Sequence, residues 1–160
     1  RINMIYEGTN TIQSLDLLGR KVLADNGKKL KAFGKRIAEF IEEEGVHEQM
    51  QEFVNPLADL GDKVTKLTTE LGMKAFANPD EVGAAAVDYL RVVGHLCFAY
   101  LFARMAKIAL AKQGSGDPFY TAKLATARFY FAKLLPETAA LIRSARAGVA
   151  PLMAMDEALF

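Results

Sequence analysis

The 160-residue sequence predicts an all-α protein, an up-and-down bundle of long antiparallel helices with a helical extension at its amino-terminal end. Apolar residues recur every three or four positions along most of the chain, which is the spacing of one face of a helix. The alternation with a period of two that marks a strand is hard to find. Proline and glycine gather at a few positions between long periodic segments, so short connections are expected, as in a bundle.

The first helix is expected to begin at Thr9 or Asn10 and to end near Asp25. Thr9 and Asn10 are residue types that cap helix starts, and Asn26-Gly27 is typical of a helix end. Its apolar residues share one face: Ile12, Leu15, Leu18 and Val22. That face needs a partner, so we expect it to dock on the bundle, to pair between copies or to be mobile.

The second helix is expected from about Lys28 to Glu44, with Gly45 as its end. Its buried stripe is expected to consist of Leu30, Phe33, Ile37, Phe40 and Ile41. The acidic run Glu42–Glu44 lies at the end of the helix that the dipole disfavours for acids. We interpret this run as a solvated helix end rather than a metal site.

Two further helices are predicted from asparagine–proline pairs, which combine a cap with a proline in the first turn. Asn55-Pro56 predicts a short helix near His47 and a longer one from Pro56 to about Phe76. Asn78-Pro79, followed by two acids, predicts a long helix that ends near Lys112.

The clearest loop, Gly114–Pro118, precedes a last long helix that ends at Ala147 before Gly148. Pro136 lies inside this helix and should kink it near Ala132–Leu135, because proline removes a hydrogen bond and crowds the preceding turn. The apolar tail 151–160 must then pack on something or fray.

Composition excludes several classes of protein. Hydrophobic residues make up 51% of the chain and charged residues 24%, so it is not disordered as a whole, and a net charge of +1 gives no support for nucleic-acid binding. The longest uncharged apolar run, Val92–Ala103, is shorter than the roughly 20 residues that cross a bilayer. Cys97, the single cysteine, is expected to be a buried inert thiol, which is compatible with a reducing cytoplasm.

The stretch with the most chemical information is Ile5-Tyr6-Glu7-Gly8-Thr9-Asn10, followed by Ile12-Gln13. On its own, it is read as a loop that enters a helix, with Glu7 as a solvated residue near the helix dipole. A glutamate just before a helix start also lies where backbone N–H groups point outward and bind negative charge.

This stretch closely resembles the active-site signature of the acyl-CoA dehydrogenases. The continuation Leu15–Lys21 resembles a subgroup with an extra helical domain after the core enzyme, and residues 129–160 also look like that domain. The resemblance implies two parts, residues 1–26 as the end of the catalytic core and residues 27–160 as a C-terminal helical bundle. We therefore expect a fragment of a longer oxidoreductase that acts in fatty acid oxidation.

The resemblance also implies roles for six residues. Glu7 is the general base that removes a proton beside the thioester carbonyl, Tyr6 lines the acyl pocket, and Gly8 lets the backbone approach the thioester. Contact with FAD is implied for Thr9, Asn10 and Thr11. Relatives often carry another residue at the position of Thr11, so the resemblance supports the assignment of Thr11 least. No metal site is expected.

In the parent enzyme the implied substrate is an acyl-CoA, the product a 2-enoyl-CoA and the electron acceptor an electron-transfer flavoprotein, with a homo-oligomer as the assembly. The fragment alone is expected to be inactive and to hold FAD weakly. The alternative is a non-catalytic helical module that stabilises an oligomer or shapes the acyl channel. A third class, a DNA-associated relative, gains no support from the net charge.

The remaining side chains that could carry chemistry are assigned structural roles. We expect the two histidines to be structural, the aromatic residues of the long central helix to be core, and the nearby cations to be solvated rather than bound to a CoA phosphate. These residues are His47, His95, Tyr89, Phe98, Tyr100, Phe102, Arg91, Arg104 and Lys107.

Overall fold

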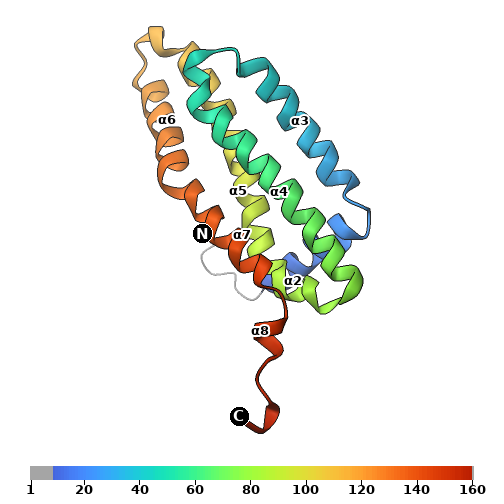
Figure 1. Ribbon diagram of the computed structural model, residues 1–160. Coiled ribbons are helices and arrows are strands. Elements are labelled where there is room, and N and C mark those ends of the chain that lie inside the picture. Colours follow the sequence, from blue (N-terminus) through green and yellow to red (C-terminus); the bar gives the residue numbers. More distant parts are fainter. Residues whose placement is uncertain (1–8, 160) are drawn as a thin grey trace.

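The computed structural model describes residues 9–159 and contains helices but no strand in this range. The α-helices are α2 (Asn10–Leu15), α3 (Lys28–Glu44), α4 (Gln51–Ala77), α5 (Asp80–Ala111), α6 (Pro118–Phe129), α7 (Thr138–Ala147) and α8 (Ala150–Met153). Helices α3, α4, α5 and the α6–α7 pair run alternately up and down (Figure 1). The predicted all-α bundle is therefore confirmed.

Helix α5 is the centre of the bundle. It packs against α4 on one side, α6 and α7 on another, and α2 with the segment Asp16–Leu23 near its start. Its buried side chains are mostly alanines, which let neighbouring helices approach closely: Ala85, Ala86, Tyr89, Val92, Leu96, Ala99, Ala103, Ala106 and Ala109. By length and composition, α5 is also apolar enough to cross a membrane, and we interpret it as the central helix of this bundle.

Enlarging a buried alanine on α5 tests this packing. Replacing Ala99, which is fully buried, by leucine is expected to lower the free energy of unfolding by about 1–3 kcal/mol, because a close-packed core has no room for the added methylenes. The same change at the exposed Ala111 is expected to alter it by less than about 0.5 kcal/mol. Urea unfolding of both variants measures the difference, and equal effects would contradict the assigned burial.

Several predicted helix boundaries are confirmed. Helix α3 begins at Lys28 and ends at Glu44, with Gly45 at its C-cap. It is preceded by Asn26 and Gly27, which have φ values of 56° and 71° and so reverse the chain in the left-handed region. Gly148 ends α7, as predicted, with a φ of 75° that favours glycine.

The predicted boundary at Asn55-Pro56 is wrong. Helix α4 begins at Gln51, after a 3₁₀ turn over Glu48–Met50, and continues through Pro56 without a break. Apolar residues on both sides of the proline, Phe53 and Leu57 among them, are fully buried in the bundle. Their packing outweighs the hydrogen bond that proline removes.

The last long helix is interrupted, as predicted from Pro136. Helix α6 ends at Phe129, a π-helical segment covers Tyr130–Leu134, a 3₁₀ turn covers Leu135–Glu137, and α7 follows. The interruption begins slightly earlier than the predicted kink. Its π-helical part widens the turn so that the proline is accommodated.

The buried face of the first helix differs from the predicted one. After α2 the chain continues as a π-helical segment, Asp16–Leu23, in which N–H groups bond to carbonyls five residues back. Leu18 and Val22 are buried against the bundle, whereas Ile12 is 56% and Leu15 38% exposed, and Ser14 is buried instead. The segment thus docks on the bundle through part of its predicted face. The division into domains at residue 26 stays a prediction.

Three further burial predictions are wrong. Phe98 is 55% exposed rather than core, and its ring meets the Tyr130 ring only at the edge, at a centroid distance of 6.4 Å. Glu44 is buried and its carboxylate lies 2.5 Å from the Lys107 amine, so the acidic run is not wholly solvated. Cys97 is only half-buried, and that burial raises the pKa of its thiol.

Candidate functional site

The catalytic segment predicted from the sequence lies only partly in the described structure. Tyr6, Glu7 and Gly8 lie outside the described residues. Thr9 is the N-cap of α2, its carbonyl accepts the N–H of Gln13 at 3.0 Å, and its side chain makes no capping hydrogen bond. The structure therefore places the end of the predicted signature at the start of a helix.

Residues 9–11 present polar groups at the start of α2. Asn10 and Thr11 are exposed, and Thr9 is partly so. The first N–H groups of a helix have no acceptor within that helix, so they can donate to a ligand together with these side chains. Helix α2 itself packs against α5, so the bundle supports this stretch from one side.

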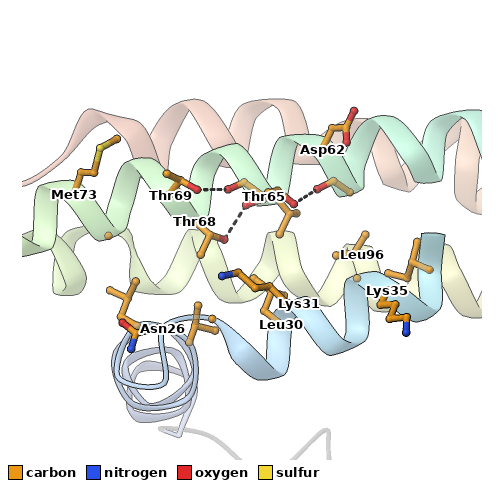
Figure 2. Close-up of a pocket in the computed structure, with 18 of the residues that line it drawn as sticks. Asn26, Leu30, Lys31, Lys35, Asp62, Thr65, Thr68, Thr69, Met73 and Leu96 are labelled. Atoms are coloured by element: carbon orange, nitrogen blue, oxygen red, sulfur yellow. Dashed lines mark hydrogen bonds between the residues drawn. The ribbon is translucent and has the colours of Figure 1, made fainter. Parts of the chain in front are cut away.

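A large groove lies between α3 and α4. It has a volume of about 1340 Å³, and one end is lined by the segment Gly19–Gly27. Glycines and alanines line it from both helices, and Leu96 of α5 lies at its floor (Figure 2). The sequence analysis did not predict this groove, whose signal is the set of small residues facing each other: Gly34, Ala38, Ala58, Gly61 and Gly72.

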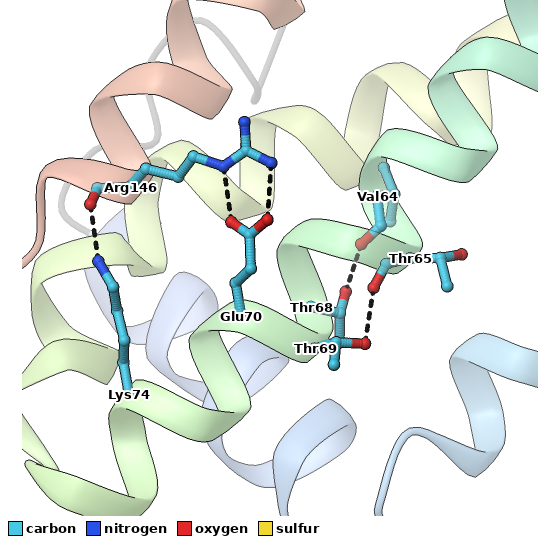
Figure 3. A network of polar contacts seen from close by, with 7 residues as sticks. All are labelled: Val64, Thr65, Thr68, Thr69, Glu70, Lys74 and Arg146. Carbon is cyan, nitrogen blue, oxygen red and sulfur yellow. Dashed lines mark hydrogen bonds and ion pairs between the residues drawn. The ribbon is translucent and has the colours of Figure 1, made fainter.

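Three threonines line the groove without offering it free hydroxyl groups. Thr65, Thr68 and Thr69 each donate to the carbonyl four residues earlier in α4, at 3.0, 2.7 and 3.0 Å (Figures 2 and 3). The Thr68 hydroxyl is also 2.7 Å from that of Tyr89. Their hydrogen bonds are made within the bundle, so this wall of the groove is suited to apolar contact.

Helix α4 is tied to α7 at the other side by a polar network. Arg146 donates two hydrogen bonds to the Glu70 carboxylate, at 2.6 and 3.0 Å, and its carbonyl accepts the Lys74 amine at 2.7 Å (Figure 3). The hydrogen bond from Arg146 lowers the pKa of Glu70, so the carboxylate stays charged. This network fixes the end of α7, from which the C-terminal tail leaves the bundle.

A second polar cluster lies where the last helix is interrupted. The Tyr130 hydroxyl donates to the His95 carbonyl at 3.0 Å and lies 3.0 Å from His95 Nδ1. Glu137 is 3.5 Å from His95 Nε2 and also pairs with Arg91. The cluster joins α5 to both sides of the π-helical segment, so the structural role expected for His95 fits its contacts.

The His95 ring in this cluster predicts how the stability of the fold depends on pH. Burial, and to a lesser extent the Arg91 charge, lower the pKa of His95 below its usual 6.5, so folding favours the neutral ring. This contribution to stability is complete above pH 6.5 and is lost as the pH falls through the folded pKa. We expect the melting temperature to fall less between pH 7.5 and 5.5 in His95→Gln than in the unsubstituted chain, as scanning calorimetry would show; an equal fall would contradict this assignment.

The cations considered as phosphate ligands are engaged within the bundle. Arg91 pairs with Glu137 and Lys107 with Glu44, whereas Arg104 lies 5.6 Å from the centre of the Tyr100 ring. Among residues 9–159, no three His, Cys, Asp or Glu side chains come together as a metal site would require.

Comparison with known proteins accounts for this combination of a signature and a helical bundle. The family described as "Acetyl-CoA dehydrogenase C-terminal like" matches residues 33–156, which is most of the chain. The chain belongs to this C-terminal domain family of acyl-CoA dehydrogenases. The match covers α4 to α7 completely, so the bundle and not only the signature carries the relationship.

Three curated relatives agree with this assignment. A broad-specificity linear acyl-CoA dehydrogenase of Mycobacterium tuberculosis is 29% identical over 100% of the chain and 28% of its own length. A 3-methylmercaptopropionyl-CoA dehydrogenase of Ruegeria pomeroyi is 35% identical over 88% of the chain and 24% of its own length. A butyryl-CoA dehydrogenase of Syntrophomonas wolfei is 26% identical over 100% of the chain and 27% of its own length. The chain thus spans about a quarter of the length of the relatives it matches.

Proposed function

We propose that this chain is the C-terminal part of an FAD-dependent acyl-CoA dehydrogenase that converts an acyl-CoA thioester to a 2-enoyl-CoA. The observation that carries the proposal is the signature Tyr6–Asn10, followed at once by helix α2 and by the bundle of the dehydrogenase C-terminal family. The relatives named for their acyl-CoA substrates support the reaction class. Their substrates differ, so we assign no acyl chain.

In the proposed reaction, Glu7 takes the proton from the carbon next to the thioester carbonyl. That proton is weakly acidic, so the negative charge that builds on the carbonyl oxygen has to be stabilised, and the backbone N–H of Glu7 is assigned to this oxygen. Gly8 leaves room for the thioester because it has no side chain. When substrate excludes water from the carboxylate, the charged form is disfavoured and Glu7 becomes a stronger base.

FAD, when bound, accepts the hydride that leaves the neighbouring carbon. Thr9, Asn10 and Thr11 are the residues of this chain that would hold it, through the exposed side chains and first-turn N–H groups described above. We further propose an electron-transfer flavoprotein as the electron acceptor, a homo-oligomer as the assembly and the cytoplasm as the location.

Product analysis of the parent enzyme tests the reaction. The parent protein, incubated with a saturated acyl-CoA and an artificial electron acceptor, is expected to form the 2-enoyl-CoA of the same chain length, identified by mass spectrometry. A series of butyryl-CoA, longer linear acyl-CoAs and 3-methylmercaptopropionyl-CoA covers the substrates named for the relatives. A parent protein that leaves the whole series unchanged would contradict the proposal.

The isolated chain is expected to be colourless and inactive. It carries one face of the cofactor site at most, so FAD added in excess should be lost on gel filtration. Absorbance near 450 nm of the eluted protein measures retention. A chain that stays yellow and reduces a dye with acyl-CoA would show that these residues hold the whole site.

A non-catalytic role of residues 27–160 is the second candidate. It is favoured by the groove between α3 and α4, most of whose lining residues belong to this part of the chain and are apolar or small. Glu7→Gln in the parent protein separates the two candidates, because only the reaction needs a carboxylate at that position.

A further inference from the structure

We propose that the groove between α3 and α4 binds the C-terminal tail, residues 149–159, of a second copy of this chain. The proposal is independent of the reaction at Glu7. It rests on two surfaces that the described structure leaves uncovered. One is the groove, and the other is the apolar side of the tail.

The size of the groove favours a helix as its occupant. Its volume of about 1340 Å³ exceeds the range of about 300–1000 Å³ that is usual for pockets that bind small molecules. Its lining residues extend along both helices, from Leu30 to Glu42 of α3 and from Ala58 to Phe76 of α4, which is the form of a site that takes an amphipathic helix. Small side chains on both walls leave room for a third backbone, and the threonines have their hydroxyl groups satisfied.

The tail has the sequence of such a helix. Leu152, Met155 and Leu159 are spaced by three and four residues, so they would share one face of a continuous helix. Pro151 lies in the first turn, where proline is favoured, and most of the residues that follow are strong helix formers. A helix of about ten residues is marginal on its own, below the roughly 12–15 residues that isolated helices need.

The structure shows this tail without a partner. Helix α8 stops at Met153, and a separate 3₁₀ turn covers Glu157–Leu159. The three side chains of the apolar face are exposed, at 66% for Leu152, 59% for Met155 and 75% for Leu159. The tail extends away from the bundle (Figure 1). An apolar segment with helical spacing that is helical only in separate short turns and is not buried is typical of one that folds on binding.

Charged side chains of both signs line the groove: Lys31, Lys35, Glu42 and Asp62. Lys31 lies in the groove (Figure 2) and forms no ion pair within residues 9–159, whereas Lys29 and Lys35 lie near acids of their own segment. The tail carries Asp156 next to its apolar face. An acid that flanks the docked helix would give Lys31 a partner.

A second copy is favoured over the chain's own tail. The base of the tail is held beside α5, because a Cβ at Gly148 would lie 2.7 Å from Glu81 Oε2, and only Gly148 and Val149 separate α7 from α8. Helix α7, from which the tail leaves, lies across α4 from α3 (Figure 1), so the chain's own tail would have to turn back around the end of α4 to lie between α3 and α4. Exchange of tails between two copies gives two equal contacts in a symmetric dimer.

Cross-linking of mixed chains tests the proposal. In a Cys97→Ser background, one chain carries Met155→Cys and the other Thr65→Cys in the groove. A short thiol-specific cross-linker is expected to join them at least tenfold more than Met155→Cys with Thr126→Cys, an exposed position on the outer face of α6. With both changes on one chain, a product joined only within that chain would overturn the proposal, and so would equal yields at Thr65 and Thr126.

Molar mass in solution gives an independent measurement. Light scattering on the 160-residue chain is expected to show a dimer that becomes a monomer when Leu152, Met155 and Leu159 are all changed to aspartate. Val46→Asp, at an exposed turn, is the matched control and should leave the dimer intact. A monomer before any substitution, or a dimer that survives the tail substitutions, would overturn the proposal.

Discussion

Replacement of Glu7 by glutamine in the parent enzyme is expected to lower the turnover of acyl-CoA by roughly 100- to 10,000-fold, which is the usual contribution of a positioned general base. Glutamine keeps the size of the side chain and loses only the group that accepts the proton. FAD should be retained, because its contacts are assigned to Thr9, Asn10 and Thr11. The rate of flavin reduction by acyl-CoA and the flavin content of the purified variant measure the two effects separately.

Two further variants make this test specific. Glu39→Gln, at an exposed position on α3, should leave turnover unchanged. Glu7→Asp keeps the carboxylate but draws it back by one methylene, so it should retain more activity than Glu7→Gln. Unchanged turnover in Glu7→Gln would show that Glu7 is not the general base. It would favour the non-catalytic role proposed for residues 27–160.

Replacement of Phe53 by alanine is expected to lower the free energy of unfolding by about 3–5 kcal/mol, as large-to-small changes of buried aromatic residues do. Phe53 is fully buried on α4, and its ring meets that of Phe131 edge to face with a centroid distance of 5.4 Å. Both the transfer free energy of the ring and the cavity left behind contribute to the loss.

Phe129→Ala is the matched control for this prediction. Phe129 is the last residue of α6 and is 57% exposed, so it loses less buried surface when truncated. Its cost should be less than half that of Phe53→Ala in urea unfolding followed by circular dichroism at 222 nm. Similar costs for the two variants would mean that Phe53 does not lie in the core as the structure places it.

Several helix boundaries could be predicted because they depend on capping residues close by in the sequence, and the structure contains these caps. The limits of α3 depend on Asn26-Gly27 and Gly45, and the start of α5 depends on Asn78, whose side chain accepts the Asp80 N–H at 3.1 Å. Such signals act over a few residues, so they can be identified in the sequence. The interruption of the last helix at Pro136 has the same local origin.

Other features depended on tertiary packing and could not be predicted in this way. Pro56 would end many helices, yet α4 passes through it because the residues around it are buried on the bundle side. The π-helical turns of Asp16–Leu23 moved the buried face of that segment from Ile12 and Leu15 to Ser14. Neither effect follows from a period of 3.6 residues.

The candidate site likewise has one part that could be predicted from the sequence and one part that could not. The signature around Glu7 is contiguous, so its resemblance to a dehydrogenase active site could be seen in the sequence alone. The groove depends on how α3 is placed beside α4. Phe33 and Phe40 of α3 contact the Tyr100 ring of α5, and these contacts help to fix the position of α3. Residues that meet only in the folded bundle gave no contiguous motif.

The most direct measurement is a structure of the parent protein with a bound acyl-CoA that cannot be oxidised. A carboxylate oxygen of Glu7 is predicted to lie about 3–3.5 Å from the carbon next to the thioester carbonyl, the separation of reacting atoms in a near-attack geometry. The thioester oxygen should at the same time accept the backbone N–H of Glu7. A Glu7 side chain that points into solvent, with the thioester held elsewhere, would contradict the account.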